Sequence, residues 1–201
     1  MWKHKGRPHT PSAPQWQYGA VYPVCSISQT LYMYGIWKMS REKYQLYTIA
    51  KYYLDLANRG RNYPQIMAMT SDQISSDSDN RITMNPGMRI MAHLTSCAFR
   101  LCTLWETYNS STNNYRHIYY EKVRGNFARR GSYSKLTIKQ NIKANLADHI
   151  FYLLRDASGH VENNAQKPWE DRQFILSDIT CLEVINSMEQ ALNKIKNDLN
   201  L

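Results

Sequence analysis

The sequence has few cysteines and lacks the short motifs that mark common enzyme sites. Its four cysteines are scattered along the chain, at Cys25, Cys97, Cys102 and Cys181, and no two of them form a CxxC pair. This pattern excludes a cysteine-rich zinc cluster and predicts free buried thiols, as in a reducing compartment. No two histidines have the spacing of a zinc site, and there is no Walker loop, GxGxxG or GxSxG motif. We therefore expect neither a metal nor a cofactor.

Long apolar runs are also missing. The most apolar stretch near the N-terminus, residues 19–37, is interrupted by Pro23 and by several polar residues. We expect neither a signal peptide nor a membrane span, and hence a cytoplasmic protein. An alternating strand pattern of useful length is absent as well, which argues against a sheet.

The chain does show helical periodicity. Apolar residues recur at spacings of three and four over residues 27–58, 88–108, 136–155 and 169–199. Ser40 is a candidate N-cap, Gly60 is a candidate helix stop, and a short helix is expected after Pro64. With 201 residues, of which 43% are hydrophobic, the chain can form one packed domain. We predict an all-α, up-and-down bundle of four to six helices over residues 27–201, preceded by an irregular, basic, Pro-rich arm over residues 1–26.

The net charge of +9 is unevenly distributed. Residues 1–143 carry 20 basic and 7 acidic side chains, whereas residues 144–201 carry 5 and 9. The densest basic stretch, 115–143, interleaves cations with aromatic residues, a composition suited to single-stranded nucleic acid. Its candidate RNA-binding residues are Arg116, Lys122, Arg124, Arg129, Arg130, Lys135, Tyr119 and Tyr133. A solvated helix face with ordinary core aromatics would have the same composition.

One segment between the last two predicted helices carries candidate catalytic residues. It contains Arg155, Asp156 and, four residues later, His160. An Arg followed by a polar residue and then a His, at the junction of two long helices in a small α-bundle, resembles the R-x4-H motif of the HEPN family. The resemblance implies a metal-independent ribonuclease of the toxin or antiviral-defence type, and it covers the order of helices over residues 27–199. It also implies a homodimer that brings two motifs together, and an antitoxin or another defence-system subunit as partner.

The residue types fit this chemistry. His160, with an ordinary pKa of about 6.5, can move a proton near neutral pH, and Arg155 can donate two parallel hydrogen bonds to a phosphate. Asp156 can orient either of them. Residues five apart on an unbroken helix diverge by about 140°, so Gly159 or a second chain must bring the pair together. One departure stands out, because HEPN toxins with nucleotidyltransferase antitoxins commonly have a Tyr where this chain has Glu162.

Two other interpretations remain open at this point. In the first, Arg155 only caps a helix C-terminus and His160 is an ordinary loop residue. In the second, the chain is a non-catalytic HEPN-like module that binds nucleic acid or assembles with a partner through the apolar stripe of its last helix. The leading prediction is an endoribonuclease that cleaves single-stranded RNA or an RNA loop such as that of tRNA.

Overall fold

The computed structural model describes residues 27–76, 85–109, 114–119, 132–159 and 175–201. The chain divides into two compact units, Met1–Trp37 and Lys38–Leu201. In the first unit, the described residues 27–37 form the N-terminal part of a helix, and the predicted arm of residues 1–26 lies outside the described part. The second unit contains the remaining helices and the core.

Five helices of ten residues or more are present in the described part of the chain. They are α1 (Ile27–Asn58), α4 (Pro86–Tyr108), α6 (Ser132–Ala144), α7 (Ile150–Gly159) and α9 (Cys181–Asp198). Short helical segments join them, namely η1 (Arg59–Asn62), α2 (Pro64–Ala68), α3 (Ser71–Ser76), α5 (Tyr115–Tyr119) and η3 (Leu146–Asp148). The described residues contain no strand beyond one isolated bridge, between Thr70 and Thr180. The predicted all-α bundle is confirmed.

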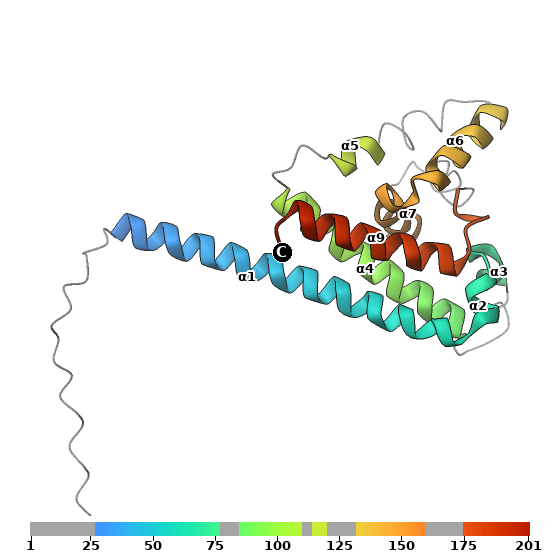
Figure 1. Cartoon of the computed structure of the whole chain (residues 1–201), viewed down its shortest axis with the longest axis horizontal. Coiled ribbons are helices and arrows are strands. Elements are labelled where there is room, and N and C mark those ends of the chain that lie inside the picture. The colour runs from blue at the N-terminus through green and yellow to red at the C-terminus, as the bar shows by residue number, and fades with distance from the viewer. Residues whose placement is uncertain (1–26, 77–84, 110–113, 120–131, 160–174) are drawn as a thin grey trace, which may run out of the picture. The chain divides into compact units, whose positions relative to one another are not determined.

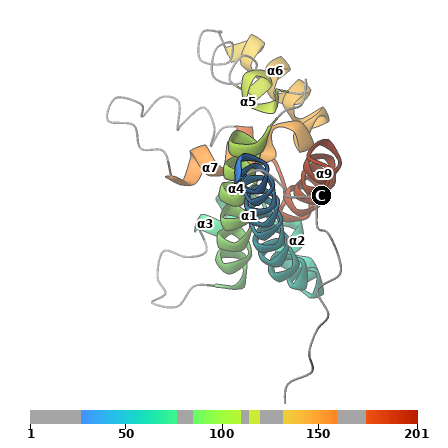
Figure 2. The same ribbon diagram turned by 90° about the vertical axis from the view of Figure 1, so that its left-hand side faces the viewer.

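Helices α4 and α9 lie side by side at the centre of the bundle, and the part of α1 after Lys38 runs along one edge (Figure 1). Contacts between the ends of the helices give their directions. Lys43 near the start of this part of α1 donates to the carbonyl of Leu199, and Asn58 at its end donates to Glu189 at 2.7 Å. Helix α1 is therefore antiparallel to α9. Figure 2 shows α7 lying across α4 rather than along it.

The core is formed by apolar residues from all these helices. Its largest fully buried side chains include Trp105 of α4, Tyr119 of α5, and Phe151 and Tyr152 of α7. Cys97, Cys102 and Cys181 are buried and free, as predicted, while Cys25 lies outside the described residues. Within the described part of the chain, no helix is both long and apolar enough to cross a membrane.

Helix α1 changes character along its length. From Lys38 to Glu42 every residue is exposed, whereas Tyr47, Leu54 and Ala57 contribute a buried stripe to the core. The helix begins at Ile27, so the expectation that Ser40 caps its N-terminus is wrong. The predicted stop is close, because α1 ends two residues before Gly60.

Gly60 is required at the turn after α1 for a steric reason. A Cβ atom built at this position would lie 2.3 Å from Cδ1 and 2.8 Å from Cγ1 of Ile90 in α4. Both distances are shorter than a real carbon contact, so any larger residue would displace either the Ile90 side chain or η1 itself. The glycine therefore allows the chain to pass close to α4 as it turns toward α2.

The helix predicted over residues 136–155 is in fact two helices. Helix α6 ends at Ala144, and the backbone leaves helical geometry at Asn145 (φ −120°, ψ 36°) and again at His149 (φ −121°, ψ −23°). The Asn145 side chain donates to the carbonyl of Asn141 at 3.1 Å. Asparagine commonly competes for backbone hydrogen bonds in this way. The break lets α6 and α7 point in different directions, although their apolar residues continue one periodicity.

The last helix begins later than predicted, at Cys181 instead of Trp169. Thr180 caps it: the Thr180 hydroxyl accepts from the Glu183 amide at 3.2 Å, and the Glu183 carboxylate accepts from the Thr180 amide at 2.8 Å. This reciprocal pair is a capping box, which satisfies two backbone donors that a helix end leaves open. Ile175 and Ile179 precede the helix and are nevertheless buried.

Candidate functional site

Arg155 and Asp156, two of the three predicted catalytic residues, lie in the C-terminal half of α7. Both are inside the protein rather than on its surface, because 9% of the Arg155 side chain and 2% of the Asp156 side chain are exposed. Helix α7 is strongly apolar up to Leu154, and the helix packs against α4. A buried charge is costly unless it is paired, so the partners of Arg155 determine what it can do.

The Arg155 guanidinium contacts two carboxylates. Its Nε donates to Asp156 Oδ1 at 2.9 Å, and its Nη1 donates to Glu106 Oε1 at 2.9 Å. The second oxygen of Asp156, Oδ2, accepts from the hydroxyl of Tyr119 at 3.0 Å. Helix α7 thus supplies two members, and helices α4 and α5 one each, of a connected polar group, which we call the Arg155 cluster: Arg155, Asp156, Glu106 and Tyr119.

Aromatic rings cover one side of this cluster. The guanidinium carbon of Arg155 lies 4.9 Å from the centroid of the Tyr152 ring, within the range of a cation–π interaction. The Tyr152 ring in turn stacks on Tyr119, with centroids 5.3 Å apart and planes 19° apart. Because Arg155 is held by two carboxylates and a ring, its orientation is fixed before any ligand arrives.

The protonation states around Arg155 follow from burial and charge. Burial lowers the pKa of Arg155, but its hydrogen bonds to the carboxylates of Asp156 and Glu106 raise it, and the net direction is upward. Burial also raises the pKa of Cys102 far above its ordinary value, and Arg155 only partly opposes this shift. Arg155 is therefore a permanent cation, while the Cys102 thiol stays protonated near neutral pH and is not a nucleophile.

The described residues include only part of the predicted motif. His160, the third catalytic candidate, lies outside the described residues, directly after the end of α7 at Gly159. Four of the predicted RNA-binding cations, Lys122, Arg124, Arg129 and Arg130, also lie outside them, as does the side chain of Tyr133. The relation of these residues to the Arg155 cluster stays a prediction.

The remaining three RNA-binding candidates have different surroundings. Arg116 is exposed, with its Nε 3.9 Å from Glu106 Oε1, so it extends the Arg155 cluster to the surface. Lys135 of α6 is partly exposed. Tyr119, in contrast, is fully buried, and its hydroxyl is used by Asp156. Its ring offers no face to a base, so the structure gives Tyr119 a supporting role instead of the expected stacking role.

Two further lysines of the basic stretch, one buried and one exposed, are paired with carboxylates of the protein. Lys139 of α6 is buried and donates to Ser177 Oγ at 3.0 Å and to Asp178. Lys143 lies 3.2 Å from Glu183 Oε1 in the first turn of α9. These contacts, the α6–α9 pairs, hold α6 against the segment that leads into α9. Part of the positive charge over residues 115–143 thus serves the fold.

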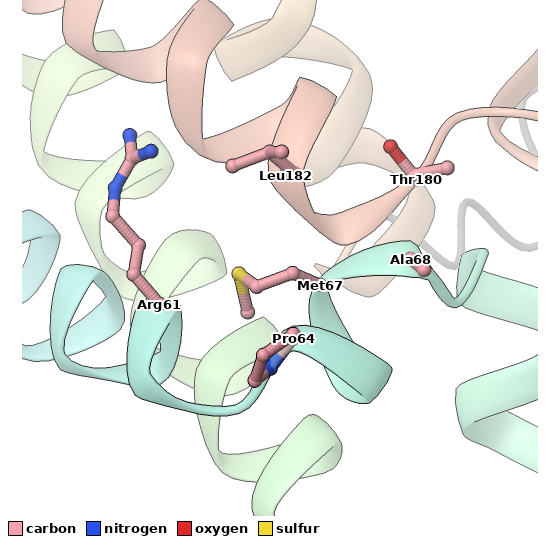
Figure 3. Close-up of a pocket in the computed structure, with 6 residues that line it drawn as sticks. All are labelled: Arg61, Pro64, Met67, Ala68, Thr180 and Leu182. Atoms are coloured by element: carbon pink, nitrogen blue, oxygen red, sulfur yellow. The ribbon is translucent and has the colours of Figure 1, made fainter.

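A pocket of about 350 Å³ lies elsewhere, between α2 and the start of α9. Figure 3 shows Met67 between Pro64 and Leu182, with Arg61 at one end. The Arg61 guanidinium donates to Asn186 at 2.7 Å and to Glu189 at 3.1 Å. None of the predicted site residues lines this pocket.

Two members of the Arg155 cluster were not singled out from the sequence in this role. Glu106 was not named at all, yet it follows the buried residues Cys102 and Trp105 at the end of α4. Its position four residues after Cys102 continues the buried face of that helix, which is the available signal. The contact between Tyr119 and Asp156 had no such signal, because it joins residues 37 apart in the sequence.

Comparisons of the chain with protein-family models, with curated proteins and with solved structures found no match. Among the described residues, no three His, Cys, Asp or Glu side chains are grouped so that they could hold a metal ion.

Proposed function

We propose that the chain is a HEPN-like, metal-independent endoribonuclease that cleaves single-stranded RNA or an RNA loop such as that of tRNA. The observation that carries this proposal is the fixed Arg155 guanidinium. It lies in the C-terminal half of α7, held by Asp156 and Glu106 at 2.9 Å, and His160 follows the helix end directly. A rigid cation with a histidine five residues later in the sequence is a pair of residue types suited to phosphodiester chemistry, which needs charge stabilisation and proton transfer.

Each residue has a defined role in the proposed reaction. His160 takes the proton of the ribose 2′-hydroxyl, or returns one to the leaving 5′-oxygen, as the 2′-oxygen attacks the adjacent phosphorus. Arg155 stabilises the charge that grows on the non-bridging oxygens. Asp156 and Glu106 do not touch substrate in this scheme, and they hold the guanidinium in one orientation. A homodimer of the chain supplies a second copy of the motif, as the family resemblance implies.

The same resemblance suggests the biological setting. We propose a cytoplasmic toxin or antiviral-defence effector, whose partner is an antitoxin or another subunit of the defence system. Exposed cations near the motif, such as Arg116, support an RNA substrate because each neutralised phosphate releases counterions.

One observation favours a second candidate function. With 9% of its side chain exposed and two carboxylates beside it, Arg155 is already neutralised inside the protein. A guanidinium in this state is typical of a structural cluster, and the chain would then be a non-catalytic HEPN-like module that binds nucleic acid or assembles with a partner. The two functions differ in whether His160 is needed. The endoribonuclease requires His160 for RNA cleavage, whereas the non-catalytic module has no cleavage activity to lose.

The test is RNA cleavage in EDTA by the purified full-length chain and by two variants. His160→Ala removes the proton-transfer group, and we expect the rate to fall at least about 100-fold. Arg100→Gln is the matched control, since it removes an exposed cation of α4 that belongs neither to the Arg155 cluster nor to the candidate RNA-binding residues. We expect it to leave the cleavage rate unchanged.

Cleavage products with 2′,3′-cyclic phosphate ends would support the proposed chemistry. Equal cleavage by the parent and by His160→Ala would reject the endoribonuclease assignment. Salt-sensitive binding of RNA by the parent, with no cleavage of any RNA tested, would identify the non-catalytic module instead.

A further inference from the structure

A second surface of the chain combines exposed aromatic rings with an excess of basic residues, and it lies on α1. From Lys38 to Arg61 the chain carries six basic and two acidic residues. The two acidic residues each lie near a lysine one turn earlier, with 4.0 Å between Lys38 and Glu42 and 3.7 Å between Lys51 and Asp55. The stretch keeps a net positive charge, which favours a polyanionic partner over a basic or uncharged one.

Exposed basic and aromatic residues of this stretch gather on one side of the helix. At 100° per residue, Arg41, Tyr44, Lys51 and Tyr52 fall within an arc of about 100°, which also contains the exposed Thr48 and the Asp55 that pairs with Lys51. Arg59 follows directly after the helix, as the first residue of η1. We call Arg41, Tyr44, Lys51, Tyr52 and Arg59 the α1 face. It points away from the buried stripe of α1, and it belongs to the edge of the bundle that α1 forms after Lys38 (Figure 1).

The two tyrosines of the α1 face are exposed to solvent, and each ring contacts a neighbouring tyrosine ring. Tyr44 is 60% exposed and Tyr52 is 57% exposed. The Tyr44 ring lies 6.5 Å from the buried ring of Tyr47, and the Tyr52 ring packs edge-on against Tyr53 at 5.7 Å. Because each ring already contacts a neighbouring ring, its side chain has less conformational freedom to lose when a ligand binds.

The spacing of the rings suits an extended strand. Eight residues along a helix correspond to about 12 Å, so Tyr44 and Tyr52 are too far apart to contact the same base. Unpaired bases stack on aromatic rings regardless of sequence, and basic side chains beside the rings contact the phosphates. A duplex hides the faces of its bases and cannot use the rings in this way.

We propose that the α1 face binds single-stranded RNA, with Tyr44 and Tyr52 stacking on two unpaired bases and Arg41, Lys51 and Arg59 contacting the backbone. The choice of RNA over other polyanions rests on the proposed function. The α1 face lies on a different helix from the Arg155 cluster, so it is a substrate-binding surface and not a further part of the catalytic group.

Binding can be measured without cleavage. The probe is a fluorescein-labelled, 12-nucleotide 2′-O-methyl oligouridylate, which has no 2′-hydroxyl to attack the phosphate, and its anisotropy reports the Kd for the full chain. We expect Tyr44→Ala with Tyr52→Ala to raise Kd at least about tenfold, and Tyr44→Phe with Tyr52→Phe to change it less than about twofold. Lys51→Gln should reduce the slope of log K against log salt by about 0.7.

Tyr63→Ala is the matched control, because Tyr63 is also 54% exposed but lies after η1 and outside the α1 face. It should leave Kd unchanged. The proposal is overturned if the parent does not bind the probe, if the double alanine variant binds as well as the parent, or if Tyr63→Ala weakens binding equally. A change of oligomeric state in the double variant, with RNA affinity unchanged, would assign the α1 face to a second copy of the chain.

The experiments distinguish failure of the catalytic assignment from failure of the proposed RNA binding by the α1 face. Loss of probe binding in the α1 variants, together with cleavage that does not depend on His160, would reject the catalytic assignment and keep the binding surface. The reverse pattern would keep the catalytic assignment and reject the α1 face.

Discussion

The Arg155 cluster and the α6–α9 pairs both join basic side chains to carboxylates, but they differ in how much water reaches them. In the Arg155 cluster, both Arg155 and Asp156 are buried. In the α6–α9 pairs, Lys139 is buried while 59% of the Asp178 side chain is exposed. Removing the partner of a buried charge lowers the stability of the fold strongly, because water cannot replace that partner. Removing the partner of an exposed charge changes stability little, because water solvates the charge that remains. The two groups should therefore respond very differently to loss of one carboxylate.

The largest effect is expected from Asp156→Asn. This change leaves the buried Arg155 with one carboxylate in place of two, and removal of one member of a buried pair costs about 3 kcal/mol or more. Urea unfolding of the full chain gives the free energy of unfolding. Asp55→Asn is the control, because the Lys51–Asp55 pair is exposed and should change stability by less than about 0.5 kcal/mol. Similar losses of unfolding free energy in Asp156→Asn and Asp55→Asn would contradict the expected difference between buried and exposed ion pairs.

A smaller effect is expected from Tyr119→Phe. The change keeps the ring, which stacks on Tyr152, and removes only the hydroxyl that donates to Asp156 at 3.0 Å. A hydrogen bond to a buried charged group contributes about 2 kcal/mol, and the same unfolding measurement should show that loss. Tyr63→Phe, at an exposed tyrosine, should unfold like the parent. An unchanged stability in Tyr119→Phe would mean that Asp156 is held by Arg155 alone.

The smallest effect is expected in the α6–α9 pairs, and it depends on pH. Burial raises the pKa of Asp178, but hydrogen bonds from Lys139 and Ser177 lower it, and the net pKa lies below its ordinary value. A lowered pKa in the folded state stabilises the protein above the ordinary carboxylate pKa of about 4, and the contribution disappears as the pH falls through the lowered value.

Asp178→Asn removes a carboxylate that is 59% exposed and leaves the buried Lys139 with its hydrogen bond to Ser177 Oγ, so it should cost about 1 kcal/mol at pH 7 and nothing at the acid end of the titration. Unfolding in urea at a series of pH values, for the parent and for Asp178→Asn, measures this difference. The two stability curves should converge as the pH falls. Curves that stay parallel would show that Asp178 acts through packing instead of charge.

Sequence periodicity predicted the helices well where burial alone determines the fold. It identified α1 and α4 almost to the residue, because their apolar stripes are long and each ends near a glycine or an asparagine. It failed where a polar side chain interrupts a helix without interrupting the apolar spacing. Asn145 separates α6 from α7, and Thr180 starts α9 after Ile175 and Ile179 had already suggested a helix.

The residue types of the candidate site could be predicted from the sequence, but their burial could not. The residue types of Arg155 and Asp156 indicated a cation beside a carboxylate, and the structure contains that pair. Their burial depends on Glu106, 49 residues earlier, and on Tyr119, which only the folded chain brings to Asp156. Partners so distant in the sequence leave no local pattern, so periodicity alone could not separate a buried cluster from a surface one.

Helix α1 has one further consequence for the motions of the chain. Its residues from Lys38 to Glu42 are exposed on every side, while the turns from Tyr47 onward are anchored in the core. Backbone amides in the exposed turns need only local fraying to exchange with solvent deuterium, whereas those around Leu54 need the bundle to open. A single continuous helix should therefore show a steep gradient of hydrogen-exchange protection, and an RNA strand seated on it would flatten that gradient from its unprotected end.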